Sequence, residues 1–220
     1  HEGGVSDDLR RRLMVEAFQT TAAYDTAISA YFAKLVEGGQ LPSQLRLAFE
    51  KVQDLRYGEN PHQRAAFYSD LGSTLYSVAA ARKMQGKELS FNNILDLDAA
   101  WRLVTEIDEP ACVIVKHTNP CGTGTGASPL EAYERAWACD PTSAFGGIIA
   151  FNERVDAAAA RKVTGQFVEA LIAPGFEGEA LKALGKKANL RVMSMDTTGI
   201  HKAGGFDLRR VMGGLKPPQW

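Results

Sequence analysis

The residues best suited to chemistry lie in one stretch, where a Lys-His pair follows an apolar run and precedes a cluster of glycines. The apolar run spans residues 111–115, Lys116 and His117 form the pair, and the glycines fall within residues 122–126. A neutral imidazole can accept a proton from an attacking amine, and an ammonium can stabilise the oxyanion that forms on a carbonyl. The pair therefore suits acyl or formyl transfer.

Two adjacent residues share a site only under a geometric condition. Neighbours in a regular strand point to opposite faces, so Lys116 and His117 can meet only where strand pairing ends and the backbone bends. Pro120 and Gly122 favour such a bend. The alternative interpretation is that Lys116 is a solvated strand end and His117 a hydrogen-bonded loop residue, and the residues alone leave both interpretations open.

A strand and a helix must position the pair. The apolar run predicts a strand over 111–116, and the glycines predict a turn. Ser128, Pro129 and Glu131 then predict the start of a helix, because a capping serine, a proline at the first position and a glutamate at the third satisfy free backbone N–H groups. Open α/β sheets bind ligands at the carboxyl ends of their strands, which is where this interpretation puts the pair.

Strand-length apolar runs alternate with helical patterns through the rest of the chain. Strands are expected over 49–55, 111–116, 147–151, 167–172 and 190–195, and helices over 96–107, 129–139, 156–163 and 177–187. Such alternation predicts an α/β fold with a mostly parallel sheet covered by helices. Before it, a capping Ser6 and helical spacing predict one or two N-terminal helices that end at Gly38, and residues 38–43 are the best candidate boundary.

Three positions outside the Lys-His pair could also contact a ligand. Arg56 could grip a phosphate with its planar guanidinium, and Gly146 has no Cβ to keep a ligand away from the backbone. Glu169 interrupts an apolar run, so it either contacts a polar ligand or faces water. The competing interpretation of Arg56 is a surface arginine before a turn, and that of Gly146 is an ordinary helix-to-strand connection.

Composition narrows the class of protein. A chain of 220 residues with 45% hydrophobic residues can bury a core, and a formal net charge of -1 without a basic run argues against a nucleic-acid partner. The three cysteines form no C-x-x-C pair, so no metal is expected. No apolar stretch of about 18 residues and no signal peptide is present, which predicts a cytoplasmic protein without a membrane partner.

Several segments, in order, resemble the formyltransferase domain of the bifunctional purine biosynthesis family. The segments are LRYGENPHQ at 55–63, LSFNNILDLDAAW at 89–101, KHTNPCG at 116–122, CDPTSAFGG at 139–147 and IAPGFEGEAL at 172–181. Residues 9–36 resemble the helical tail of the cyclohydrolase domain that precedes the transferase in this family. The resemblance therefore implies a cyclohydrolase tail and linker over 1–48 and the first half of the formyltransferase domain over 49–220.

The resemblance also implies an activity. In this family a formyl group passes from 10-formyltetrahydrofolate, a co-substrate, to the 5-amino group of aminoimidazole carboxamide ribotide, and the cyclohydrolase domain then closes the purine ring. By motif, His117 would be the general base and Lys116 the stabiliser of the transition state. The transferase domain of the family has two halves of cytidine-deaminase-like, three-layer α/β architecture.

Binding roles carry over in the same way. Arg56 and Tyr57 would hold the ribotide from the neighbouring subunit of a homodimer, and Gly146 would approach it through its backbone. Glu169 would also contact the ribotide, at a position where some relatives have aspartate. The cyclohydrolase body and the second transferase half, which supplies most folate contacts, lie outside the resemblance, and the isolated chain is expected to have negligible transferase activity.

Three other functions remain open from the sequence. Gly122, Gly124 and Ala127 formally match a dinucleotide-binding fingerprint, which would make the protein an oxidoreductase. Asn119-Pro120-Cys121 is similar to part of a zinc deaminase motif, although Gly124 stands where the second cysteine belongs.

The third possibility is a non-catalytic dimerisation module. Phe18, Tyr24, Tyr31 and Phe32 recur at helical spacing. Such residues are more often part of a core than of a partner surface.

Overall fold

The computed structural model describes residues 4–37, 42–71, 77–195, 209–211 and 214–216. Backbone contacts divide the chain into two compact units. One comprises His1–Glu50 with Asp70–Gly72, and the other comprises Lys51–Ser69 with Ser73–Trp220. The predicted boundary at 38–43 includes residues 38–41, which lie outside the described residues.

The first unit contains one long helix, α1 (Asp7–Glu37). The Ser6 hydroxyl accepts the Leu9 N–H at 3.3 Å, and Asp7 and Asp8 occupy the first turn, where negative charge is favourable. The sequence prediction of a helix here is confirmed, with one helix rather than two.

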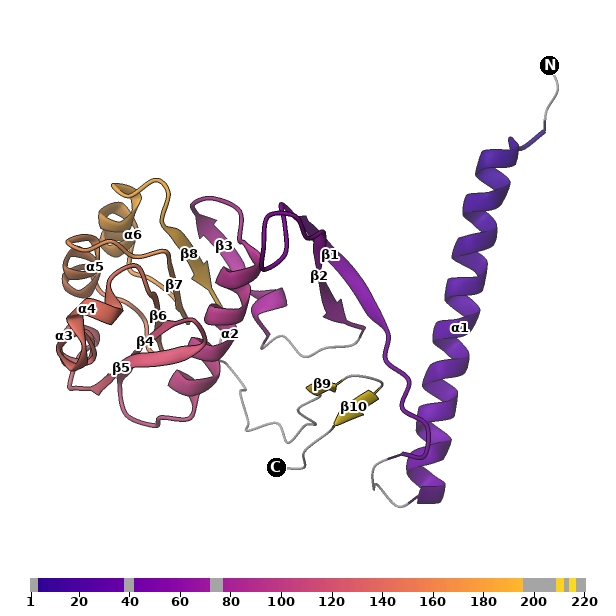
Figure 1. Ribbon diagram of the computed structural model, residues 1–220, viewed down its shortest axis with the longest axis horizontal. Helices are drawn as coiled ribbons and strands as arrows, with labels where there is room; N and C mark the ends of the chain where they lie inside the picture. The colour runs from indigo at the N-terminus through magenta and orange to yellow at the C-terminus, as the bar shows by residue number, and fades with distance from the viewer. Residues whose placement is uncertain (1–3, 38–41, 72–76, 196–208, 212–213, 217–220) are drawn as a thin grey trace. The chain divides into compact units, whose positions relative to one another are not determined.

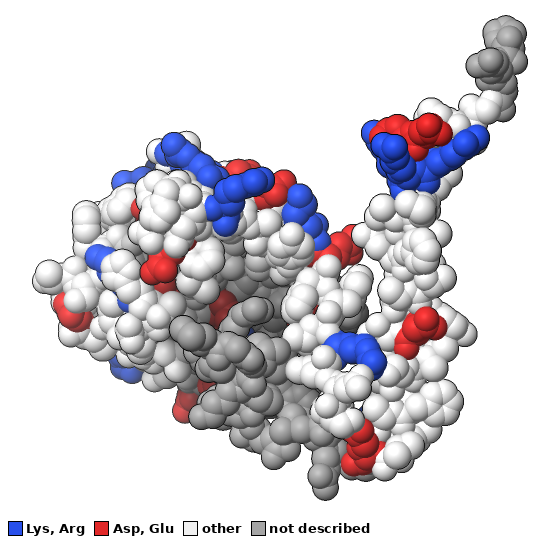
Figure 2. All heavy atoms as spheres, turned by 45° about the vertical axis from the view of Figure 1, so that its right-hand side comes forward, with Lys and Arg blue, Asp and Glu red and all other residues white. Residues whose placement is uncertain are grey.

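No residue of α1 is buried, and its large apolar side chains are exposed. Phe18 is 70% exposed and Tyr24 67%, and Tyr31 and Phe32 are exposed as well. Figure 2 shows a long uncharged surface on this helix between the charged groups at its amino end and those further along. In the described part of the chain these four side chains are exposed and do not belong to a core, and Tyr31 and Phe32 pack only on each other, with ring centroids 5.4 Å apart.

The second unit is built on a six-stranded sheet in the order β3-β8-β7-β6-β4-β5 (Figure 1). Its strands are β3 (Arg82–Gln85), β4 (Ala111–Lys116), β5 (Asn119–Thr125), β6 (Ile148–Phe151), β7 (Ala170–Ala173) and β8 (Arg191–Ser194). Strands β6, β7 and β8 are parallel, whereas β3, β4 and β5 each pair antiparallel. The α/β class is confirmed, but the sheet is mixed rather than mostly parallel.

Helices cover both faces of this sheet, which confirms three layers. On one face lies α2 (Phe91–Thr105), and on the other lie α3 (Pro129–Cys139), α5 (Ala157–Thr164) and α6 (Gly178–Gly185) (Figure 1). Alternation along β4 serves both layers, because Cys112 and Ile114 pack in the α3 core while Val113 and Val115 pack against α2.

Short elements complete the described structure. They are η1 (Val78–Ala80), α4 (Pro141–Ala144) and the two-stranded sheets of β1 (Phe49–Leu55) with β2 (Ala65–Asp70) and of β9 (Arg209–Val211) with β10 (Gly214–Lys216).

Candidate active site

The Lys-His pair lies at the tip of a hairpin. β4 and β5 pair antiparallel up to Lys116 and Asn119, so His117 and Thr118 alone form the connecting turn. The prediction of a strand, a glycine-rich turn and a helix is wrong in its middle part, because the glycine-rich segment is itself strand β5. The bend falls at His117 and Thr118 rather than at Pro120 and Gly122, where the register only shifts at a bulge.

The glycines of β5 allow helix α3 to pack directly on the strand. A Cβ at Gly122 would lie 1.9 Å from the Ala136 carbonyl oxygen, and one at Gly124 would lie 2.5 Å from the Ala132 carbonyl oxygen. This close helix-to-strand contact explains why small residues recur there. It also removes the basis of the dinucleotide-binding alternative, since Gly122 and Gly124 face protein backbone and not a loop that could cradle a pyrophosphate.

The turn is strained. His117 has φ 55° and Thr118 has φ 60°, the positive values that a two-residue type I′ hairpin requires and that Asn-Gly sequences adopt most easily. For residues with a full side chain, this conformation costs about 1–3 kcal/mol each. Threonine is especially unfavourable because its Cβ is branched. Strain of this kind is frequent at functional sites, where the surrounding structure maintains it.

Lys116 lies beside Gly146, which is one of the predicted substrate-binding residues. Its ammonium donates to the Phe145 carbonyl at 3.0 Å, and Gly146 follows directly with φ 75°. The Gly146 N–H donates to the Phe167 carbonyl at 2.9 Å, and a Cβ on Gly146 would meet the Phe167 ring at 3.3 Å. The structure thus brings Lys116, His117 and Gly146 to one edge of the sheet.

This edge differs from the one that the sequence indicated. β4 runs antiparallel to β6, so its carboxyl end, with Lys116, lies beside the amino ends of the parallel strands β6, β7 and β8. The rule that ligands bind at carboxyl ends of parallel strands therefore does not describe the site.

The charges beside the pair act on Cys121 of β5. Burial raises the pKa of the Cys121 thiol, and the Asp140 carboxylate adds to that increase, while the Lys116 ammonium lowers it. The pKa of Asp140 is lowered because the Ser143 hydroxyl donates to it at 2.6 Å and the Ser143 N–H at 3.0 Å. Cys121 consequently remains a neutral thiol, which is a poor nucleophile.

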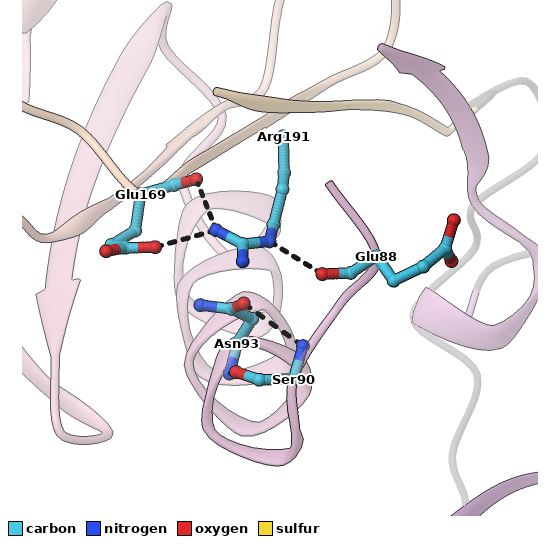
Figure 3. A network of polar contacts seen from close by, with 5 residues as sticks. All are labelled: Glu88, Ser90, Asn93, Glu169 and Arg191. Carbon is cyan, nitrogen blue, oxygen red and sulfur yellow. Dashed lines mark hydrogen bonds and ion pairs between the residues drawn. The ribbon is translucent and has the colours of Figure 1, made fainter. Parts of the chain in front are cut away.

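Glu169 takes part in an ion pair. Arg191 Nη1 donates to Glu169 Oε2 at 2.7 Å, and Arg191 Nε donates to the Glu88 carbonyl at 2.9 Å (Figure 3). The Arg191 side chain is only 14% exposed and that of Glu169 is 38% exposed. The two possibilities considered from the sequence, a polar ligand or water, did not include this partly buried arginine, whose position could not be inferred from the local sequence pattern.

A cleft of about 460 Å³ opens beside this ion pair. Its lining includes Lys87, Lys186 and Lys187 together with Glu169 and Arg191. Four cationic groups against one carboxylate favour an anionic ligand. Phe167 also lines the cleft and packs on the ring of Phe145 with centroids 5.5 Å apart, although Lys116, His117 and Gly146 are not among the lining residues.

Arg56 and Tyr57 lie in the segment that follows β1. The Arg56 guanidinium stands 5.8 Å from the centroid of the Tyr57 ring, and Arg56 is exposed. Within the described ranges, no hydrogen bond or ion pair joins either residue to the Lys116-His117 turn. Their contribution to a neighbouring subunit stays a prediction.

The remaining alternatives can be compared with the structure. Among the residues that the structure describes, no group of three or more His, Cys, Asp or Glu side chains could hold a metal ion, so the zinc deaminase interpretation has no ligand set there. None of the described helices is long and apolar enough to cross a membrane.

The chain was compared with models of known protein families. The family model described as AICARFT/IMPCHase bienzyme matches residues 1–216 of the chain. The match covers both compact units and includes the Lys116-His117 turn.

Proposed function

The chain belongs to the AICARFT/IMPCHase bienzyme family, whose enzymes act in purine biosynthesis, and from this premise we propose that it serves formyl transfer. The formyl donor is 10-formyltetrahydrofolate, and the acceptor is the 5-amino group of aminoimidazole carboxamide ribotide. The observation that carries the proposal is the Lys116-His117 pair, presented on a strained hairpin turn at the rim of the sheet. Strain retained at exposed polar residues is better explained by function than by folding.

The proposed reaction uses both side chains. The ribotide amine attacks the formyl carbon, and the His117 imidazole removes the amine proton as the C–N bond forms. Lys116 stabilises the negative charge that develops on the formyl oxygen. When the bond from the formyl carbon to N10 breaks, the proton held by His117 passes to N10 and tetrahydrofolate leaves. The acceptor amine is weakly basic because it is conjugated with the imidazole ring and the carboxamide, so proton removal is important.

Binding of the ribotide is assigned to four residues. Gly146 would approach it through the backbone, where φ 75° and the missing Cβ leave space. Glu169 would contact it through the carboxylate oxygen that Arg191 does not use, and the cationic cleft beside Glu169 supports an anionic substrate. Arg56 and Tyr57 would complete the site of the partner in a homodimer, where the exposed Arg56 guanidinium, 5.8 Å from the centroid of the Tyr57 ring, could grip the phosphate.

The organisation of the chain follows from the same proposal. Residues 1–48 form the tail of the cyclohydrolase domain and a linker, and 49–220 form the first half of the transferase domain of a cytoplasmic enzyme. The exposed apolar surface of α1 supports this division, because a helix with no buried residue requires a partner to cover it.

We expect Lys116→Met to lower kcat for formyl transfer by about 10²–10³-fold, since methionine keeps the length of the side chain but removes the charge that stabilises the oxyanion. The measurement is release of tetrahydrofolate by the active enzyme that carries this chain. The matched control is Lys182→Met, which removes an exposed lysine whose partner is Glu179 on α6. Wild-type turnover by Lys116→Met would contradict the proposed function.

The apolar surface of α1 gives a second prediction. The isolated chain is expected to self-associate as its concentration rises, because Phe18 and Phe32 are exposed on a helix without a covering partner. Static light scattering should show a lower average mass for the double variant Phe18→Ser, Phe32→Ser. Gln19→Ser on the same helix is the control and should associate like the wild type. A wild-type chain that stays monomeric at every concentration tested would show that this surface needs no partner.

A further inference from the structure

We infer that Asp96 of α2 is a positioning residue that holds the His117 turn in its strained conformation, an inference that rests on the proposed role of His117 as the base. The Asp96 carboxylate accepts both N–H groups of the turn, from His117 at 3.3 Å and from Thr118 at 2.7 Å. These two residues are the ones with positive φ among the non-glycine residues described. One carboxylate therefore contacts the whole two-residue turn.

Asp96 lies on a helix that is packed into the core. It follows the first turn of α2 and precedes Leu97, which is fully buried in the core against the sheet, and Ala100 and Trp101 further along the helix are buried there too. Hydrogen bonds from N–H groups to an ionised carboxylate are stronger than those to a neutral acceptor. The carboxylate thus ties the turn to a helix whose own position is determined by the core.

The other hydrogen bonds of the turn cannot tie it to the core. Asn119 Nδ2 donates to the His117 carbonyl at 2.8 Å, and the Thr118 hydroxyl donates to the same oxygen at 2.7 Å. Both donors belong to the hairpin itself and would move with it. Among the described residues, Asp96 is the side chain outside the hairpin that holds the backbone of the turn, so its loss would let His117 leave the geometry needed for proton transfer.

The test compares substitutions in the active enzyme that carries this chain. Asp96→Ala should lower kcat by about 10–100-fold, because a displacement of about 1 Å of a catalytic group has an effect of that size. KM for the ribotide should change less than about threefold, because both carboxylate oxygens of Asp96 are engaged by N–H groups of the turn. Asp98→Ala is the matched control, since Asp98 lies on the same helix and pairs with Arg102 at the surface, and its kcat should equal that of the wild type.

A rescue experiment separates positioning from general loss of structure. Glycine adopts positive φ without strain, so Thr118→Gly should restore part of the kcat that Asp96→Ala removes. An equal loss with and without Thr118→Gly, or a wild-type kcat for Asp96→Ala, would overturn the inference. If Asp96→Ala has a wild-type kcat, the His117→Asn variant separates the two ideas. An inactive His117→Asn variant would leave the proposed function standing, whereas an active one would refute both the proposed function and the role of Asp96.

Discussion

Replacing His117 with asparagine is expected to lower kcat for formyl transfer by about 10²–10⁴-fold, the usual contribution of a general base. Asparagine is chosen because it tolerates positive φ better than other side chains, so the turn at φ 55° should persist while the proton acceptor is lost. Steady-state assays with both substrates measure the effect, and the loss should appear in kcat rather than in KM. Thermal unfolding should be unchanged or slightly improved.

The adjacent residue supplies the control for this prediction. Thr118 has φ 60° in the same turn, so Thr118→Asn makes the same kind of backbone change one residue away. Because β-branched residues are poorly suited to this conformation, Thr118→Asn should stabilise the protein by up to about 1 kcal/mol and keep its activity. If His117→Asn and Thr118→Asn have equal turnover, His117 does not act as the base.

Local signals predicted the elements whose ends are chemically marked. The strand over 111–116 and the helix over 129–139 have the predicted bounds, because the first is an uninterrupted apolar run and the second begins with the Ser128 cap and Pro129. The Ser128 hydroxyl accepts the Glu131 N–H at 3.3 Å, as the capping pattern requires. The α2 helix begins earlier than predicted, at Phe91, because Ser90 and Asn93 cap each other through reciprocal hydrogen bonds.

The glycine-rich segment shows why the local sequence pattern predicted a turn where the structure has a strand. Three glycines in six residues have the composition of a turn, since glycine is the residue most often found at positive φ. In the structure Gly122 and Gly124 lie within β5 and Gly126 follows it, and their missing side chains make space for α3. Which of these two uses applies depends on a helix that begins after the segment and folds back on it. Because the glycines were assigned to a turn, the sequence also gave no indication that β4 and β5 form an antiparallel pair.

The position of the candidate pair in the fold was predictable from the sequence, whereas the residues that contact it from other elements were not. Lys116 and His117 could be identified because an apolar strand delivers them to a polar turn. Asp96 and Arg191 contact the site from distant parts of the chain, and nothing in the local sequence distinguishes them from surface charges on a helix and a strand. Their partners are determined by how α2 and β8 pack, which is a property of the whole fold.

Replacing Gly122 with alanine is expected to destabilise the second unit by about 3 kcal/mol or more, at or above the upper end of the usual cost of overpacking a core. The new Cβ would stand 1.9 Å from the Ala136 carbonyl oxygen and 3.2 Å from the Cys139 Cβ. A side chain could rotate away, but a carbonyl in the middle of a helix cannot. Either α3 must shift or the pairing of Gly122 with Ile114 must break. Urea unfolding, analysed from the midpoint and the slope, measures the loss.

Gly178→Ala provides the comparison, because a Cβ at Gly178 would meet no atom within 4 Å and the residue begins helix α6. That substitution should be neutral or stabilising by less than about 1 kcal/mol, since alanine loses less backbone entropy than glycine in a helix. The difference between the two variants isolates the contact with α3 from the general effect of adding a methyl group. If Gly122→Ala unfolds at the same urea concentration as Gly178→Ala, the close packing of β5 against α3 is wrong. The proposed position of the Lys116-His117 turn, which this packing supports, would then be wrong as well.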